Sequence, residues 1–434
     1  MFVRRSSIVA ALCGSLVVAV AGGAIEARGQ AADAPADWTQ LERSQQLTDY
    51  RLALREGGFD EASKKFLTTM ALPQLGLQAN RGSIERVRRR MRELLCGDAA
   101  SDPKAVDAAL QTISDFTTAA ARNERVEPVV RINALLLLGE LKGKDGKPWP
   151  AAAAPLAAAV ADPKLPLPLK IVAAQGLDRQ VEAAGPAAGP TVGPVLVKLL
   201  AGLPEVKDRT AADWLTARAL AMLADLGTAA PPEAAPLALA ILEDASRTTT
   251  IRARAAAALA ATGAKAPGID QAKAVAACRA TARAALEAEK ANGERRRELG
   301  LLGSTAAQPG QPGFGGPPPG VAGEANAVSA VPEAACRRVA WELMTFARAL
   351  GGADGKQGIS AFRGPQQQAA QELAATLREA ATMIDATPDE TSILDALAIL
   401  TGGPAPAPRE APAAVGEAAP APDASEPAVN PFGQ

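Results

Sequence analysis

The residue types that most often perform chemistry at neutral pH are scarce in this chain. It contains no histidine among 434 residues, which removes the commonest general base and the commonest metal ligand. A Ser-His-Asp triad, a Cys-His pair and a histidine-ligated zinc site are therefore excluded. Paired carboxylates need no histidine, but sugar-cleaving sites of that kind usually have aromatic walls, and aromatic residues make up only 3% of the chain.

Three short motifs resemble functional signatures, and each lacks an essential part. Ser101 and Lys104 match the first motif of a penicillin-recognising serine site, but the companion motifs are missing. The loop 351–357 is one residue short of a phosphate loop and has no hydroxyl for magnesium. The loop 143–147 carries one carboxylate, too few for calcium. The sequence therefore predicts no catalytic residue, no cofactor, no metal site and no small-molecule ligand.

Positive and negative residues are balanced over the whole chain, but basic residues are concentrated in one short segment. The chain has 46 Lys and Arg against 47 Asp and Glu, which argues against a nucleic-acid partner because phosphate binding needs a basic footprint. The helix expected over 83–96 is strongly basic, through Arg86, Arg89 and Arg90 with Arg88 and Arg92 beside them. It is either a site for an acidic partner or anionic envelope polymer, or a solvated face partly paired through Glu85 and Arg89, and the solvated face is the favoured interpretation.

The N-terminus has the pattern of a secretory signal. Arg4 and Arg5 precede an uncharged run from Ile8 to Ile25, and small residues follow. We expect cleavage after Ala21, Ala24 or Ala31, in preference to an uncleaved anchor, because a run rich in alanine and glycine spans a membrane only marginally. The mature chain is then exported to the periplasm, cell envelope or exterior, and no later stretch is expected to cross a membrane.

Three cysteines follow the signal: Cys96, Cys278 and Cys336. An odd number does not make a complete disulfide framework, and no Cys-x-x-Cys pair is present. Cys278 and Cys336 each lie on an apolar helical stripe, which favours buried thiols. A bridge between these two remains an alternative in an oxidising compartment.

Composition divides the chain into six parts. These are a signal and lead-in (1–31), N-terminal helices that cap a stack (38–102), repeated helix pairs (103–303), a Gly/Pro-rich insertion expected to be disordered (304–332), a last repeat with a C-terminal helical cap (333–402), and an Ala/Pro-rich tail expected to be disordered (403–434). The final helix is expected to start after a Thr387 cap, with Pro388 first and Glu390 completing a capping box.

One pattern recurs through the middle of the chain. A small residue followed four positions later by a bulky apolar one appears at intervals of 39, 46 and 36 residues, and again 85 residues on, at Ala134, Ala173, Ala219, Ala255 and Ala340. Such periods are typical of helix-pair repeats. The small residue permits a close helix crossing, and the bulky one, at 138, 177, 223, 259 and 344, fills the core.

The run 130–139, with Arg131, Ala134 and Leu138, resembles the second helix of a HEAT repeat, and the run 251–260 is similar to it. The resemblance covers about 103–351. It implies an all-α solenoid of about five to seven antiparallel helix pairs whose second helices line a concave surface. It also implies that most similar proteins act as scaffolds or binders, although one HEAT-like type attaches pigments as a lyase.

The basic residue near the start of each second helix is a candidate for partner binding. These residues are Arg131, Lys170, Arg252 and Arg337. They either form a ladder along the concave face or, as the resemblance favours, pair with carboxylates of adjacent repeats such as Glu127, Asp162 or Asp244.

The expected function is that of an exported, non-catalytic scaffold that binds a protein or cell-envelope partner. Two alternatives remain open: an enzyme or accessory subunit that uses carboxylates or lyase-like chemistry, and a structural component of the cell envelope.

Overall fold

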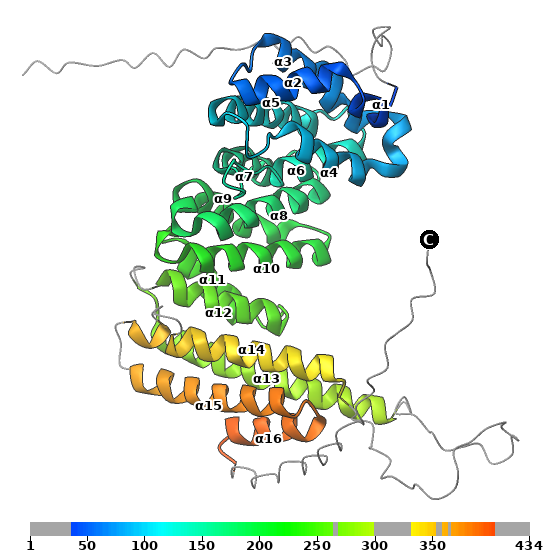
Figure 1. The fold of residues 1–434 in the computed structure, drawn as a ribbon. Coiled ribbons are helices and arrows are strands. Elements are labelled where there is room, and N and C mark those ends of the chain that lie inside the picture. The colour runs from blue at the N-terminus through cyan, green and yellow to red at the C-terminus, as the bar shows by residue number, and fades with distance from the viewer. Residues whose placement is uncertain (1–35, 264–267, 299–330, 353–357, 363–365, 404–434) are drawn as a thin grey trace, which may run out of the picture. The chain divides into compact units, whose positions relative to one another are not determined.

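The computed structural model describes residues 36–263, 268–298, 331–352, 358–362 and 366–403 (Figure 1). The predicted signal lies outside these ranges, as do nearly all of the insertion and nearly all of the tail. The described residues form helices and no strand, which confirms the all-α prediction. The chain divides between Ala234 and Ala235 into two compact units, and this division falls inside the range 103–303 predicted as one run of repeats.

Unit 1 contains ten α-helices within the described residues. They are α1 (Trp38–Glu42), α2 (Gln45–Glu56), α3 (Glu61–Phe66), α4 (Ile84–Leu95), α5 (Pro103–Arg122), α6 (Pro128–Gly139), α7 (Ala153–Ala161), α8 (Leu167–Ala184), α9 (Gly189–Gly202) and α10 (Arg209–Leu226).

Side-chain caps fix where several of these helices begin. Asp102 accepts hydrogen bonds from the Lys104 and Ala105 amides at the start of α5, and Pro103 takes the first helical position. The helical pattern from Trp38 to Glu56, which ends at Gly57 and Gly58, predicts a single helix, and that prediction is wrong. Ser44 accepts a hydrogen bond from the Leu47 amide and starts α2 separately from α1, because its hydroxyl satisfies an amide that a continuous helix would bond internally.

Helices α5 to α10 of unit 1 pack in two layers. Within this unit α6, α8 and α10 lie side by side, and α7 packs beside α9 (Figure 1). Each member of the first layer also packs against the helix that precedes it in the chain, so that α5 pairs with α6, α7 with α8 and α9 with α10. The described part of unit 1 therefore consists largely of consecutive antiparallel helix pairs.

The recurring alanines lie in the interior, as the sequence predicts. Ala134, Ala173, Ala219 and Ala255 are 0% exposed, and Ala340 is 5% exposed. The bulky partners at 138, 177, 223 and 259 are fully buried too. Met344 is only partly buried, so that prediction is wrong. The neighbouring Leu343 is 0% exposed and takes the core position, which moves the apolar face of this helix by one residue.

Helices α6 and α8 of unit 1 approach each other closely at two glycines. A Cβ placed on Gly139 would lie 2.7 Å from the Gly176 Cα, and one placed on Gly176 would lie 2.9 Å from the Gly139 Cα. Real Cβ atoms do not tolerate such distances, so both positions require glycine for this crossing. Two backbones that approach this closely gain dispersion contacts around the crossing.

One stretch, Leu167–Glu205, is long and apolar enough to be a candidate membrane span, since an 18-residue window within it has a mean hydropathy of 1.3. The sequence prediction that no later stretch crosses a membrane stays a prediction. In the structure this stretch is not one helix: α8 ends at Ala184, Gly185 has a φ of 54°, and α9 starts at Gly189. Both helices pack within unit 1, which accounts for their apolar character.

Unit 2 holds the remaining described helices. They are α11 (Ala234–Glu243), α12 (Thr249–Gly263), α13 (Gln271–Glu298), α14 (Glu333–Gly351), α15 (Gln367–Ala386) and α16 (Glu390–Leu400).

In unit 2, α14 packs on α12, α13 and α15, and α16 packs on α13 and α15. The predicted cap of α16 is wrong: Asp389 has extended backbone and forms the capping box with Ser392. Pro388 consequently precedes the cap instead of starting the helix.

Replacing Gly139 with alanine tests the α6–α8 crossing. We expect Gly139→Ala to destabilise unit 1 by about 1–3 kcal/mol, because the new methyl group meets backbone that cannot rotate away. Intrinsic helix propensity alone would favour alanine by about 1 kcal/mol. The sign of the change in the free energy of unfolding therefore shows which effect is larger. Urea unfolding followed by circular dichroism measures it. Gly202→Ala is the control, since a Cβ there meets nothing within 4 Å; equal stability of the two variants would contradict the close crossing.

Candidate binding surface

The three basic residues predicted on α4 have different environments. Arg90 pairs with Glu42 at 2.8 Å and with Glu93 at 2.7 Å. Arg86 and Arg89 are exposed and form no ion pair within the described residues, and the structure shows no Glu85–Arg89 pair there. These two arginines of α4 therefore lack an ion-pair partner there, although the charge of Arg86 helps to lower the pKa of Glu42.

Two of the predicted ladder residues are buried and bond to the backbone. Arg131 is 6% exposed and its Nε donates to the Ala121 carbonyl at 2.8 Å. Arg252 is 7% exposed and its Nε donates to the Leu242 carbonyl at 2.7 Å. In both cases the acceptor lies ten residues earlier, near the end of the preceding helix, where a guanidinium satisfies a free carbonyl. These arginines tie two consecutive helices together and offer little surface to a partner.

The other two ladder residues lie nearer the surface. Lys170 is partly buried, and burial lowers the pKa of its ammonium although Asp162 opposes the shift. Arg337 is exposed and pairs with Glu333 on its own helix. The four positions therefore do not share one environment. The predicted partner Glu127 bonds to Arg81 and not to Arg131.

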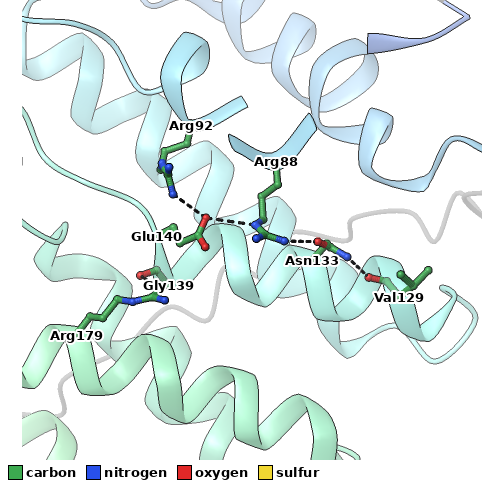
Figure 2. Close-up of polar contacts among 7 residues, drawn as sticks. All are labelled: Arg88, Arg92, Val129, Asn133, Gly139, Glu140 and Arg179. Atoms are coloured by element: carbon green, nitrogen blue, oxygen red, sulfur yellow. Dashed lines mark hydrogen bonds and ion pairs between the residues drawn. The ribbon is translucent and has the colours of Figure 1, made fainter. Parts of the chain in front are cut away.

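A different set of arginines connects successive helices of unit 1. Figure 2 shows Arg88 and Arg92 of α4 converging on Glu140, the residue after α6, at 3.3 and 2.9 Å. Arg88 also donates to the Asn133 side chain, whose amide donates in turn to the Val129 carbonyl at 2.8 Å. One carboxylate thus receives two guanidinium groups at the end of a helix.

The same kind of contact continues along the layer. Arg179 of α8 donates to the Gly139 carbonyl at 3.3 Å, and it lies beside this carbonyl in Figure 2. Arg218 of α10 donates to Asp178 of α8 at 2.7 Å. Both contacts join positions 40 residues apart, so each helix reaches back to the one before it.

We call this set the arginine strip. Its members are Arg88, Arg92, Glu140, Asp178, Arg179, Trp214 and Arg218.

The strip exposes more guanidinium than carboxylate. The side chains of Arg92 and Arg218 are 32% and 38% exposed, whereas Glu140 and Asp178 are 15% and 25% exposed. Burial raises the pKa of Asp178, and Arg218 partly offsets this. Trp214 lies partly exposed with the Arg218 guanidinium 5.3 Å from its ring centre, within range of a cation–π contact.

The sequence analysis missed Arg179 and Arg218. The signal that could have found them is the repeated interval of 40 residues, which joins Gly139 to Arg179 and Asp178 to Arg218. The recurring alanines lie at the centre of each helix, whereas these contacts lie on its polar face.

Unit 2 contains a buried carboxyl group that takes no part in the strip. Glu342 of α14 is 0% exposed; its Oε1 accepts from the Thr250 hydroxyl at 2.5 Å, and its Oε2 has no hydrogen-bond partner. Burial raises the pKa of Glu342, against the opposing effects of Thr250, Thr249 and Arg338. Glu289 is 3% exposed and pairs with Arg338.

All three described cysteines are buried free thiols, so Cys278 and Cys336 are not bridged. Burial raises the pKa of Cys96 and of Cys278 to about 12 and that of Cys336 to about 11. Thiols with such pKa values are inert as nucleophiles at neutral pH. Among the described residues, no cluster of acidic or cysteine side chains is arranged to hold a metal ion.

No known family model matches the chain, and no curated protein shows significant similarity to it.

Removing the Glu140 carboxylate tests the strip. We expect Glu140→Gln to destabilise unit 1 by about 1–3 kcal/mol, because it leaves Arg88 and Arg92 partly buried without their counter-charge. The exposed Glu93→Gln is the control and should cost less than about 0.5 kcal/mol. Urea unfolding of both variants measures the difference, and equal costs would show that the strip adds no stability.

Glu342 makes the stability of unit 2 depend on pH. Its pKa is higher in the folded chain than in the unfolded chain, so the folded state prefers the neutral carboxyl. The stability contribution is fully present below the unfolded pKa and is lost as pH rises through the folded pKa. We therefore expect Glu342→Gln to raise the melting temperature at pH 7 and to change it little at pH 4. A variant less stable than the wild type at pH 7 would show that the ionised group is stabilising.

Proposed function

We propose that this chain is an exported, non-catalytic scaffold built as a HEAT-like solenoid of five to seven helix pairs, and that it binds an acidic protein surface through the arginine strip. The pairing of α5 with α6, α7 with α8 and α9 with α10, with α6, α8 and α10 side by side, supports the solenoid. The signal-like N-terminal sequence supports export.

The observation that carries the proposal is the position of the strip on consecutive second helices. In a HEAT-like array the second helices line the concave surface. Here α8 and α10 each add an arginine to one set of contacts, and Glu140 after α6 accepts two more from α4. Partly exposed arginine and tryptophan side chains are the residue types that contribute most to protein interfaces.

The strip is also held in place before any partner binds. Glu140 fixes Arg88 and Arg92, and Asp178 fixes Arg218 beside Trp214. Ordering these long side chains in advance reduces the entropy lost on binding. The excess of exposed guanidinium over carboxylate favours a partner with acidic residues, and attraction of that kind weakens as salt rises.

Tryptophan substitution gives a matched test in the full chain. The chain is crosslinked in its source cell, the dominant partner is identified and purified, and its affinity is measured against Trp214→Ala and Trp341→Ala. Trp341 is the control because it lies in unit 2 and also stacks on an arginine, Arg254, at 5.4 Å.

We expect Trp214→Ala to weaken binding at least about tenfold, which corresponds to about 1.4 kcal/mol, and Trp341→Ala to leave it unchanged. Failure to recover a dominant partner, or equal affinities of the two variants, would contradict the proposal.

A further inference from the structure

Unit 1 contains a hollow of about 450 Å³ that the arginine strip does not use. It lies between α5 and the start of α7, on the first helices of two consecutive pairs. One wall is a row of polar side chains from α5, and the other consists of small residues that include Ala151 and Ala154. The polar row is Gln111, Ser114, Asp115, Thr118 and Arg122.

The spacing of the two walls has a structural cause. Helix α7 packs directly on α9, but α5 and α7 make no comparable contact. The loop from α6 to α7 is anchored on α5 instead: the buried Trp149 donates its Nε1 hydrogen to Asp107 at 3.3 Å. Lys144 of the same loop donates to the Ser101 carbonyl at 2.8 Å. The hollow is therefore held open by fixed contacts.

Thr118 has an unmet hydrogen-bonding requirement beside this hollow. Thr112 and Thr117 on the same helix each donate their hydroxyl to the carbonyl four residues earlier, at 2.9 and 2.8 Å. The Thr118 hydroxyl is buried and has no partner. A buried hydroxyl without a partner costs stability, and an acceptor held in the hollow would remove that cost after a rotation about χ1.

The charged residues of the polar row are separated along the helix. Asp115 and Arg122 are seven positions apart, which is about 10.5 Å along α5. Arg122 is exposed and forms no ion pair within the part of the chain that the structure describes. Asp115 accepts only an uncharged hydrogen bond there, from Gln111 at 2.8 Å. A peptide in the polyproline II conformation rises about 3.1 Å per residue and has three residues per turn, so side chains three positions apart lie on the same side and about 9 Å apart.

We propose that the hollow between α5 and α7 binds a peptide segment in the polyproline II conformation in which a basic and an acidic residue stand three positions apart. The basic residue pairs with Asp115 and the acidic residue with Arg122. Ser114 and Thr118 bond to the peptide backbone between them, and the alanine wall leaves room for that backbone. The site lies on the opposite layer from the arginine strip, so it does not rest on the function proposed above.

Fluorescent heptapeptides test this with the full chain. Each carries one lysine and one glutamate in an alanine and serine background, separated by one, two, three or four positions in either order. Fluorescence anisotropy gives the affinities. We expect a spacing of three, in one of the two orders, to bind at least about tenfold more tightly than a spacing of one. The proposal is wrong if no peptide binds or if all spacings bind equally.

Two pairs of variants locate the binding. Arg122→Gln should abolish the preference for spacing, while Arg125→Gln, an exposed arginine outside the hollow, should keep it. Ala154→Leu should block binding by filling the hollow, and Ala158→Leu, exposed one turn further along α7, should not. Circular dichroism confirms that all four variants are folded. Equal losses in Ala154→Leu and Ala158→Leu would overturn the assignment of the site.

Discussion

Two glycines, Gly139 of α6 and Gly176 of α8, set how closely the second helices of unit 1 approach one another. A Cβ built on either glycine would lie less than 3 Å from the Cα of the other. Neither position can therefore carry a side chain in this packing. The fully buried alanines at 134 and 173 keep the same two helices free of large side chains near their centres. Close backbone contact at this crossing, together with the fully buried Leu138 and Leu177, therefore holds these helices together.

The arginine strip depends on this close packing. Arg179 reaches the carbonyl of Gly139 itself, so a wider separation of α6 and α8 would break that contact. Glu140 follows directly in sequence and places its carboxylate where α4 can reach it. The contacts of the arginine strip near Gly139 and Glu140 thus depend on the close crossing of α6 and α8. The hollow between α5 and α7 shows the converse: where a loop anchored by Trp149 keeps two helices apart, a polar groove remains.

The helical class and the buried alanines could be predicted because both follow from local periodicity. The roles of the arginines could not. Arg131 and Arg92 look alike in sequence, but one bonds to a carbonyl inside its helix pair and the other to a carboxylate of another helix. Which partner each finds depends on where the neighbouring helix ends. The split at Ser44 and the cap at Asp389 were missed for a related reason, because several nearby residues can cap a helix and tertiary packing selects one.

Native-state hydrogen exchange of α6 and α8 tests the central claim most directly. If close backbone contact at Gly139 and Gly176 couples these helices, their central amides will exchange only through a shared opening, with the same free energy and the same dependence on urea. Amides of α6 that open at lower free energy than those of α8, with a separate urea dependence, would show that the two helices are independent and would contradict the account.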